Sequence, residues 1–327
     1  MEYSILGKTG IRIPRLSFGT APLGGLYGKQ NDPEGILSTQ LIHTAVQNGI
    51  RCFDTSPYYG DAECVLGKAI RGIVRENIIL CTKGGRISDD VFDYSPAGLS
   101  ASLDRSLERL GTRYIDIYLL HDIEYGDFDQ IMNEALPYLA RERAEGRLCA
   151  IGFSCFPLEL VRRALFHPNA HLIDVVLLYG HHNLVLDDIS EVTNMLEEAN
   201  IGLLDASPYA MGLLSEKGPP AWHPATQRQR EICQELSLDL IKRGSPMCHL
   251  ALRYTLANPI GTSLIIGIRN IVELMDNLNI YMSRHDFRNT GLVTFAKSRL
   301  RGLGELYFGR CRNSDSGADP SLVLPSP

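Results

Sequence analysis

The sequence predicts a (β/α)8 barrel of the TIM type, closed at the bottom by an N-terminal β-hairpin. The first reason is that short runs rich in Ile, Val and Leu alternate with stretches of helical periodicity, in eight pairs along the chain. The second reason is the length of 327 residues, at which barrels of this kind form one domain. Eight strand and helix pairs fit a closed barrel better than an open sheet.

The strands are expected in chain order, after a hairpin in which the turn residues 7–10 join two short extended runs. The hairpin strands are residues 3–6 and 11–14, and the barrel strands are 16–20, 51–53, 77–82, 114–120, 148–153, 173–178, 202–206 and 263–266. Such short, uninterrupted apolar runs are typical of parallel strands that are buried on both faces.

The helices are expected at 33–48, 61–71, 97–110, 128–145, 157–166, 189–200, 228–242, 247–257 and 271–279. The first helix has Asp32 as its N-cap and Pro33 in its first turn. Ser95 and Pro96 begin the third helix, in which leucines recur at positions 99, 103, 107 and 110, the spacing of one helix face. A Pro- and Gly-rich insertion at 218–225 delays the helix that follows the seventh barrel strand.

The composition limits the class of partner. The chain is 44% hydrophobic and 21% charged, with a net charge of −6 and no runs of like charge. This balance argues against nucleic acid and anionic membranes as partners. No apolar stretch approaches the length of a membrane span, and the first residues do not resemble a signal peptide. We expect a cytoplasmic monomer or homodimer that acts on a small molecule.

Cysteine and histidine positions indicate no disulfide framework and no metal site. The eight cysteines form no CxxC pair, and several fall within expected strands, as Cys52, Cys81 and Cys149 do, which indicates reduced core thiols. The adjacent His181 and His182 lack further ligands nearby, so we expect solvated loop histidines. Gly, Ser, Asp and Pro become frequent beyond residue 303, which predicts one domain over 1–303 and a disordered tail over 304–327.

Polar side chains stand where the expected barrel strands end. In a parallel barrel the loops at these carboxyl ends form the site. The residues at the strand ends are, in order, Thr20, Asp54, Lys83, His121, Ser154, Tyr179, Ser207 and Gly267. Tyr59 lies in the loop that follows Asp54. A tyrosine, a lysine, an aspartate and a histidine are therefore expected to converge at one end of the barrel.

This combination of side chains is suited to proton transfer. A lysine ammonium beside a tyrosine favours the phenolate and lowers the pKa of the phenol. An aspartate beside the lysine keeps the lysine charged despite burial, and a neutral histidine can donate to a substrate oxygen. The phenol can then exchange a proton with an alcohol or carbonyl oxygen, while a nicotinamide must give or take the hydride. A Schiff-base lysine of an aldolase barrel is the alternative for Lys83 alone.

Seven segments, in the right order, resemble the aldo-keto reductase family over the chain up to about residue 290. They are GTAPLG (19–24), DTSPYYG (54–60), TKGGR (82–86), SLERL (106–110), YID (114–116), LHD (120–122) and SPYAMGLL (207–214). The resemblance implies a tetrad of Asp54, Tyr59, Lys83 and His121, with Tyr59 as the acid/base. It also implies a (β/α)8 barrel that binds a nicotinamide cofactor without a Rossmann fold.

The resemblance further implies a set of cofactor contacts. They are Gly19, Thr20, Asp54, Ser154, Ser207, Pro208, Tyr209, Gly212, Leu213, Gly267, Arg269, Glu273 and Asn277. Glu273 stands where phosphate-binding members often carry arginine, and a carboxylate there would repel a 2′-phosphate. This favours NAD, although Arg269 argues for NADP. The sequence departs from the family at Cys155 and Leu177, where an asparagine and a glutamine usually hold the carboxamide.

Two stretches resemble one branch of the family in particular, the L-galactose, D-arabinose and D-threo-aldose 1-dehydrogenases. They are HDIEYG (121–126) and the insertion GPPAWHPA (218–225), which is expected to lie over the pocket. The likeness implies oxidation of the C1 hydroxyl of an aldose to the lactone, with L-galactose expected before L-fucose or D-arabinose. The expected substrate contacts are Tyr59, His121, Asp122 and Trp222.

Two other functions stay open. One is an NADPH-dependent aldehyde or pyridoxal reductase. The other is a cofactor-binding regulatory subunit, like the potassium-channel β subunits that the same family contains. An intact tetrad does not separate these functions from a sugar dehydrogenase, because such subunits keep it. Cofactor and substrate are the properties that distinguish them.

Overall fold

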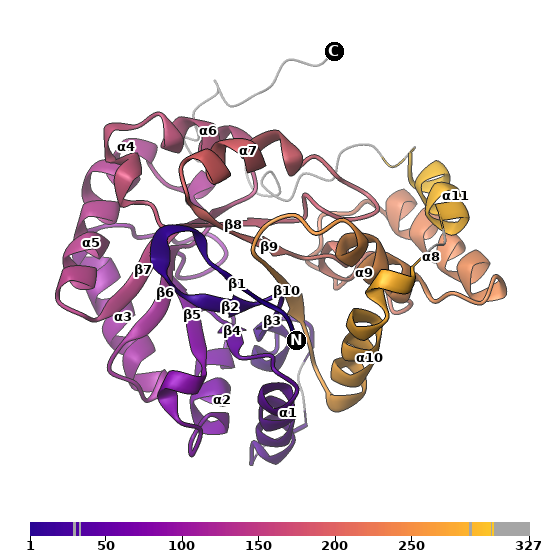
Figure 1. Cartoon of the computed structure of the whole chain (residues 1–327), viewed down its shortest axis with the longest axis horizontal. Helices are drawn as coiled ribbons and strands as arrows, with labels where there is room; N and C mark the ends of the chain where they lie inside the picture. Colours follow the sequence, from indigo (N-terminus) through magenta and orange to yellow (C-terminus); the bar gives the residue numbers. More distant parts are fainter. Residues whose placement is uncertain (29–30, 33, 288–289, 302, 304–327) are drawn as a thin grey trace.

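The structure, a computed structural model, describes residues 1–28, 31–32, 34–287, 290–301 and 303. Eight parallel strands form a closed barrel in the order β10-β3-β4-β5-β6-β7-β8-β9 (Figure 1). These strands are β3 (Leu16–Gly19), β4 (Cys52–Asp54), β5 (Ile79–Gly84), β6 (Ile115–Leu120), β7 (Leu148–Cys155), β8 (Val175–Tyr179), β9 (Gly202–Ala206) and β10 (Ser263–Gly267). The predicted (β/α)8 barrel is confirmed.

Helices lie between successive strands and cover the outside of the barrel. They are α1 (Ile36–Gln47), α2 (Ala62–Ala69), α3 (Pro96–Leu110), α4 (Phe128–Gln130), α5 (Leu136–Ala144), α6 (Leu158–Leu165), α7 (Ser190–Glu198), α8 (Gln227–Lys242), α9 (Met247–Ala257), α10 (Ile271–Met282) and α11 (Thr290–Leu300). A π-helical segment, Ile131–Ala135, joins α4 to α5. The helix predicted for 128–145 is therefore present as one helical stretch with a local change of pitch.

The N-terminal hairpin closes the bottom of the barrel, as predicted. Strands β1 (Tyr3–Ile5) and β2 (Arg12–Pro14) pair antiparallel, and Figure 1 shows them lying across one end of the barrel. Leu6 and Ile13 are fully buried and pack with inward-facing residues of the barrel strands, including Cys52 and Ile117. The hairpin thus supplies the last apolar layer of the barrel interior.

Two helix predictions require correction. Helix α1 begins at Ile36 rather than at residue 33, because Gly35 is its N-cap in a left-handed conformation with φ 74°. Asp32 still caps the helix, since its carboxylate accepts hydrogen bonds from the backbone N–H groups of Leu37 and Ser38. Pro33 lies outside the described residues.

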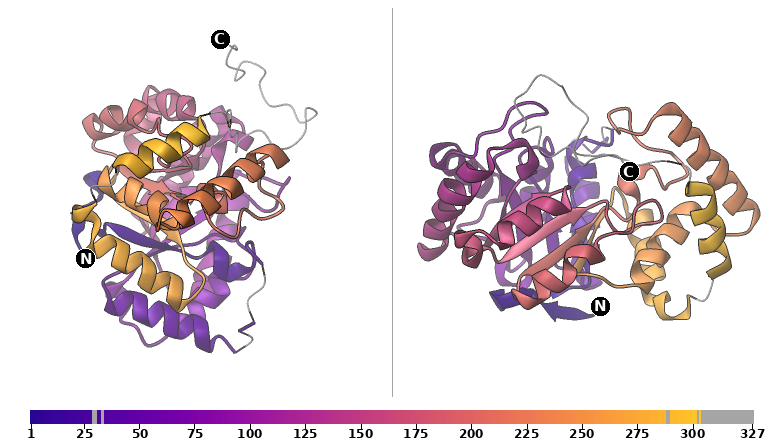
Figure 2. Two further views of the ribbon diagram at one scale, coloured as in Figure 1. Left: turned by 90° about the vertical axis from the view of Figure 1, so that its right-hand side faces the viewer. Right: turned by 90° about the horizontal axis from the view of Figure 1, so that it is seen from above.

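Helix α11 was not predicted. Its apolar residues are spread around the helix rather than gathered on one face, so the sequence carries little periodic signal. Ala296 and Leu300 nevertheless pack in a core cluster with Leu236 and Leu240 of α8, and Figure 2 shows the two helices side by side. The tail predicted for 304–327 lies outside the described residues.

The expectations for histidine and cysteine also change. His181 and His182 are buried rather than solvated, and their Nδ1 atoms lie 2.7 Å from carboxylate oxygens of Asp188 and Asp205. Cys149 is exposed although it lies in β7. Within the described residues, no cluster of three or more His, Cys, Asp or Glu could hold a metal ion. None of the helices that the structure describes is long and apolar enough to cross a membrane.

Candidate active site

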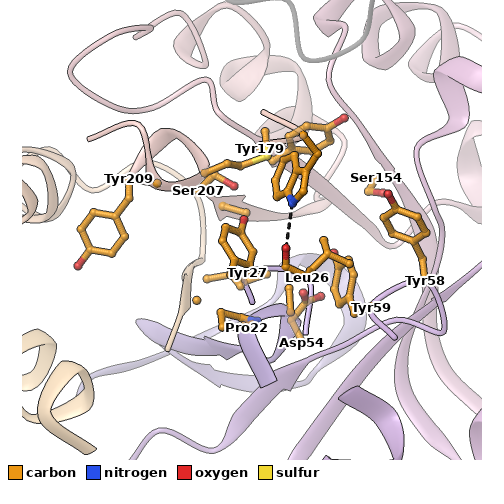
Figure 3. Close-up of a pocket in the computed structure, with 18 of the residues that line it drawn as sticks. Pro22, Leu26, Tyr27, Asp54, Tyr58, Tyr59, Ser154, Tyr179, Ser207 and Tyr209 are labelled. Atoms are coloured by element: carbon orange, nitrogen blue, oxygen red, sulfur yellow. Dashed lines mark hydrogen bonds between the residues drawn. The ribbon is translucent and has the colours of Figure 1, made fainter. Parts of the chain in front are cut away.

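A cavity of about 1280 Å³ opens at the carboxyl ends of the barrel strands. Figure 3 shows Tyr209 at one side of it and Tyr58, Tyr59 and Ser154 at the other. Most of the predicted site residues line its wall: Gly19, Asp54, Tyr59, Lys83, His121, Asp122, Ser154, Ser207, Pro208, Tyr209, Gly212, Trp222, Gly267, Arg269, Glu273 and Asn277. Tyr179, at the end of β8, also lines the cavity, so the barrel topology brings together residues from all eight strand ends.

Two predicted cofactor contacts do not line the cavity. Thr20 is fully buried, and its Oγ1 donates a hydrogen bond to the Asp54 carbonyl oxygen at 2.9 Å. Leu213 is fully buried as well, in the core cluster that includes residues of α8 and α9. Thr20 therefore supports the backbone of Asp54, and Leu213 packs below the loop after β9.

Lys83 and Asp54 form a buried ion pair beside Tyr59. The Lys83 ammonium donates to Asp54 Oδ1 at 2.5 Å and to the Thr55 carbonyl oxygen at 3.0 Å. It lies 5.0 Å from the centroid of the Tyr59 ring. The Lys83 and Asp54 residues are only 1% and 5% exposed. Strands β4 and β5 are neighbours in the barrel, which is why an aspartate at the end of one meets a lysine on the other.

The electrostatics of the pair and the phenol differ in part from the prediction. Burial is the largest single effect on Lys83 and would lower its pKa, but the Asp54 carboxylate, with smaller contributions from Tyr59 and Cys81, raises the pKa overall, so the ammonium stays charged. Burial raises the pKa of Tyr59, and the Lys83 ammonium opposes this by a smaller amount. The predicted sign of the Lys83 contribution is right. The net pKa of Tyr59 is nevertheless raised, because desolvation of the phenolate is the larger effect.

His121 is placed to donate a hydrogen bond into the cavity. Its ring stands nearly perpendicular to that of Tyr59, with centroids 5.6 Å apart. Burial lowers the pKa of His121 to about 3, so the imidazole is neutral. Its Nδ1 lies 3.0 Å from Ser56 Oγ, which already accepts from the Tyr58 N–H. In the tautomer with the proton on Nε2, Nδ1 accepts the Ser56 hydroxyl proton and Nε2 can donate into the cavity.

The loop that carries Tyr59 is held by a close backbone approach. A side chain at Gly24 would bring its Cβ within 1.6 Å of the Tyr59 carbonyl oxygen. Only glycine at this position lets the loop after β3 lie against the loop after β4. Gly60, next to Tyr59, has φ 61°, which also favours glycine. The glycines of the two motifs therefore set the position of the phenol.

Arg86 lines the cavity, although its sequence position predicts no role for it. Its guanidinium donates to Asp122 Oδ2 and stacks on Tyr58, with Cζ 3.7 Å from the ring centroid. Asp122 has φ 52°, a left-handed conformation that is uncommon outside glycine. Its backbone N–H donates to Ser154 Oγ at 3.0 Å. The available signal was the position of Arg86, three residues beyond Lys83 and two residues after the end of strand β5.

The departures from the family at Cys155 and Leu177 have different consequences. Cys155 is fully buried in the core on the outside of the barrel strands, with Sγ 3.6 Å from the Pro157 carbonyl oxygen. Leu177 faces the cavity and belongs to the inner cluster of the barrel. Neither side chain offers a hydrogen bond to a carboxamide in the cavity. Ser154 is the polar residue of the predicted set in this part of the wall.

The other end of the cavity is formed by the loops after β9 and β10. Arg269 and Glu273 form an ion pair, with Nη2 2.7 Å and Nε 2.9 Å from Glu273 Oε1. Tyr209 donates to Asn277 Oδ1 at 2.7 Å. Ser207, Ala210 and Met211 all have φ between 44° and 66°. Left-handed backbone at non-glycine residues is costly and gathers at binding sites, which points to a ligand-holding role for this loop.

The insertion crosses the cavity, as predicted. The Trp222 indole N–H donates to the Leu26 carbonyl oxygen at 2.9 Å, the contact drawn as a dashed line in Figure 3. Its ring meets that of Tyr27 edge-on, with centroids 5.4 Å apart. Arg230 donates hydrogen bonds to carbonyl oxygens of Pro219, Pro220, His223 and Ala225. The insertion is therefore anchored to α8 and joined to the loop after β3 over the cavity.

The fold and the cluster of Asp54, Tyr59, Lys83 and His121 define the class of protein as a (β/α)8-barrel oxidoreductase. The sequence profile described as Aldo/keto reductase family matches residues 15–288. The chain belongs to the aldo/keto reductase family.

Two curated relatives and a solved structure agree with this assignment. The L-galactose dehydrogenase of Arabidopsis thaliana is 34% identical over 282 residues, which cover 85% of this chain and 87% of the relative. The D-arabinose 1-dehydrogenase of Saccharomyces cerevisiae is 30% identical over 279 residues, which cover 80% and 83%. The solved holo form of an aldo-keto reductase from Bacillus halodurans superposes with a TM-score of 0.71 at 23% identity, covering 94% of this chain and 97% of the other. This last likeness supports the fold alone.

Proposed function

We propose that the protein oxidises the C1 hydroxyl of an aldose to the lactone with NAD, and that L-galactose is the preferred sugar. The observation that carries the proposal is the convergence of Tyr59, Lys83, Asp54 and His121 at one side of the large cavity. The similarity to L-galactose and D-arabinose dehydrogenases supports a sugar as the substrate.

The cavity fits a nicotinamide dinucleotide. Its volume of about 1280 Å³ exceeds what a monosaccharide alone would need. The left-handed backbone after β9 and the pairs Arg269–Glu273 and Tyr209–Asn277 lie at the end opposite the tetrad. We assign that end to the adenosine part and the wall near Ser154 and Leu177 to the nicotinamide part. When bound, the cofactor would accept the hydride from the C1 carbon of the sugar.

The residues of the chain would handle the proton. His121, neutral and protonated on Nε2, donates a hydrogen bond to the C1 oxygen and orients the sugar. Tyr59, as the phenolate, takes the proton from that oxygen while the C1–H bond breaks. Lys83 stabilises the phenolate, and Asp54 keeps Lys83 charged. In the reverse direction the Tyr59 phenol returns the proton to the carbonyl oxygen.

The pH dependence of oxidation should report on Tyr59. Because burial raises the pKa of this phenol, only a small fraction is phenolate near neutral pH. We expect kcat for sugar oxidation to rise by about tenfold per pH unit over pH 7–9, as the phenolate fraction rises below the pKa. Measurement of kcat at saturating sugar and cofactor across this range checks the prediction. A flat profile would contradict the role of Tyr59 as the base.

The ion pair between Arg269 and Glu273 supports NAD over NADP. Arg269 donates to both carboxylate oxygens of Glu273, from Nε to Oε1 and from its backbone N–H to Oε2 at 2.9 Å. The guanidinium is thereby partly neutralised, and a 2′-phosphate would meet a carboxylate. The argument for NADP that Arg269 offers in the sequence is weakened accordingly.

Replacing Glu273 by Arg should therefore move the preference toward NADP. The substitution removes the carboxylate, frees Arg269 and adds a second cation, so we expect the NADP-to-NAD ratio of kcat/KM to rise at least about tenfold, or ~1.4 kcal/mol. Steady-state kinetics with both cofactors measures this ratio. Glu197→Arg, the same change at an exposed residue of α7, is the control. An unchanged ratio in Glu273→Arg would refute the assignment of Glu273.

The test of the function itself is absorbance at the reduced-nicotinamide band. Purified protein is given NAD or NADP and a panel of L-galactose, L-fucose, D-arabinose, L-xylose and L-glucose. Reduction of NAD with L-galactose as the best substrate is the expected result. If no sugar reduces NAD or NADP, and NADPH is oxidised by simple aldehydes or pyridoxal, the protein is a reductase instead. If neither sugars nor aldehydes change the absorbance while the protein still binds the cofactor, a regulatory subunit is favoured.

A further inference from the structure

Arg86 and Asp122 form an ion pair in the wall of the cavity, next to the tetrad. Arg86 Nη1 donates to Asp122 Oδ2, and both residues line the cavity. The same carboxylate oxygen, Asp122 Oδ2, lies 3.7 Å from His121 Nε2. The ion pair therefore stands directly beside the nitrogen that would hold the C1 oxygen of the substrate.

The carboxylate of Asp122 is fixed in place. The Tyr94 hydroxyl donates to the Asp122 carbonyl oxygen at 2.9 Å, and the Asp122 N–H donates to Ser154 Oγ, which together hold the left-handed backbone. The Ser154 hydroxyl also lies 3.3 Å from Asp122 Oδ1. Figure 3 shows Ser154 at the same side of the cavity as Tyr59. A carboxylate that is held at both oxygens is a preorganised acceptor for a substrate hydroxyl.

The guanidinium of Arg86 is held as well, but few of its donors are used. Besides the stacking on Tyr58, Arg86 Cζ lies 5.7 Å and 5.8 Å from the ring centroids of Phe92 and Tyr125. Arg86 Nη2 makes no hydrogen bond to the residues that the structure describes, because the Asp89 Oδ1 that it approaches is 3.9 Å away. A guanidinium carries five N–H groups, so those of Nη2 remain available to a ligand.

The charges around Arg86 favour a neutral ligand over an anion. Asp122 is bonded to its guanidinium, Asp89 lies 3.9 Å from it, and Asp90 lines the same cavity. A phosphate or carboxylate on the ligand would therefore meet carboxylates as well as the cation. A hydroxyl group can accept from the guanidinium and donate to the carboxylate at once. The pair thus fits a hydroxyl group of the substrate.

We propose that Arg86 is a specificity-determining residue, whose guanidinium, together with the Asp122 carboxylate that it holds, binds the hydroxyl group on C2 of the substrate. The C2 hydroxyl is the one next to the C1 oxygen, and the pair is next to the His121 Nε2 that would hold that oxygen. The inference deepens the proposed aldose oxidation and rests on it. It assigns to this site substrates with a free hydroxyl at C2 and no anionic group there.

Kinetics of the full chain with NAD, its best aldose and the 2-deoxy form of that aldose test the proposal. In the wild type, kcat/KM should be about 10²-fold higher for the aldose, because the 2-deoxy sugar leaves charged groups of the site without a partner. In Arg86→Met this ratio should fall at least about tenfold, since one of the two groups that bind the hydroxyl is gone. Arg71→Met, at an exposed arginine outside the cavity wall, should keep the wild-type ratio.

The ratio separates recognition from a structural role. If Arg86 only supports the wall, its replacement slows both sugars equally and leaves the ratio unchanged, which would overturn the proposal. Arg86→Lys keeps a cation beside Asp122 and decides the question if Arg86→Met does not fold. Its ratio should fall at least about threefold, because an ammonium lacks the planar fork of the guanidinium. A wild-type ratio near one would also contradict the proposal.

A second pair of substrates distinguishes failure of this inference from failure of the proposed function. Lactaldehyde and propanal differ only in the C2 hydroxyl, and their reduction is followed with NADH or NADPH. If the wild type oxidises no aldose, the proposed function fails, while a preference for lactaldehyde that Arg86→Met abolishes supports the role of Arg86. If the wild type oxidises an aldose and Arg86→Met keeps the ratio, the function stands and the role of Arg86 is wrong. If no substrate of either pair reacts, both proposals fail.

Discussion

Replacing Tyr59 by Phe should reduce kcat for sugar oxidation by about 10²–10⁴, the usual contribution of a positioned acid/base. The ring keeps its packing near Lys83 and His121, and only the oxygen that exchanges the proton is removed. Because the phenol stands at the tetrad end of the cavity, affinity for the dinucleotide should change little. Steady-state kinetics and a titration of NADH fluorescence measure the two properties separately.

The control for this variant is Tyr114→Phe. Tyr114 immediately precedes β6, at the opposite end of the barrel strands from the cavity, and its ring stacks under Arg75. The substitution removes the same hydroxyl group at a position that does not reach the cavity, so activity should be retained. Full activity in Tyr59→Phe would remove the proposed proton path. Loss of NADH binding along with activity would instead indicate that the loop had lost its shape.

Replacing Lys83 by Met should destabilise the protein by about 3–5 kcal/mol, because it leaves the Asp54 carboxylate buried and without its cation. The Lys83 side chain is only 1% exposed, and its ammonium is bonded to Asp54 and to the Thr55 carbonyl oxygen. The same variant should lose most of its activity, since the phenolate of Tyr59 loses its neighbouring positive charge. Denaturant unfolding and kinetics measure the two effects.

The double variant Asp54→Asn/Lys83→Met separates stability from chemistry. Removing both charges eliminates the unpaired carboxylate, so more than half of the lost unfolding free energy should return. Activity should not return, because no cation stands beside Tyr59. If the double variant is as unstable as Lys83→Met alone, packing of the lysine rather than pairing of charge is what stabilises this region.

Much of the fold could be predicted because the strands and helices follow local patterns of apolar residues in the sequence. Strands that are apolar on both faces and helices with one apolar face differ in period, and eight alternations leave few topologies other than a barrel. The helix predictions failed where a contact or turn of the folded chain, rather than the apolar pattern of the segment, decides where the helix forms. Helix α11 lacks a single apolar face and is held by α8. Helix α1 begins late because the chain turns at Gly35.

The candidate site was predictable to the same extent. Parallel strands end at one rim of the barrel, so the sequence order of Asp54, Lys83 and His121 implies that they meet there. Tyr59 follows in the loop after Asp54, and motif likeness added the residues around Arg269. No local pattern indicates that Arg269 is paired to Glu273, that Arg86 is paired to Asp122, or that Thr20 faces the backbone rather than the cavity.

The sequence by itself determined the barrel, the residues at its strand ends and the family, because each depends on period, order and motif. Only the tertiary structure decided the protonation states of the site residues. The net pKa of Tyr59 is raised because the phenol is buried, although Lys83 opposes the shift. His121 is neutral because burial lowers its pKa. Burial and charge separation depend on three-dimensional distance, which no spacing along the chain specifies.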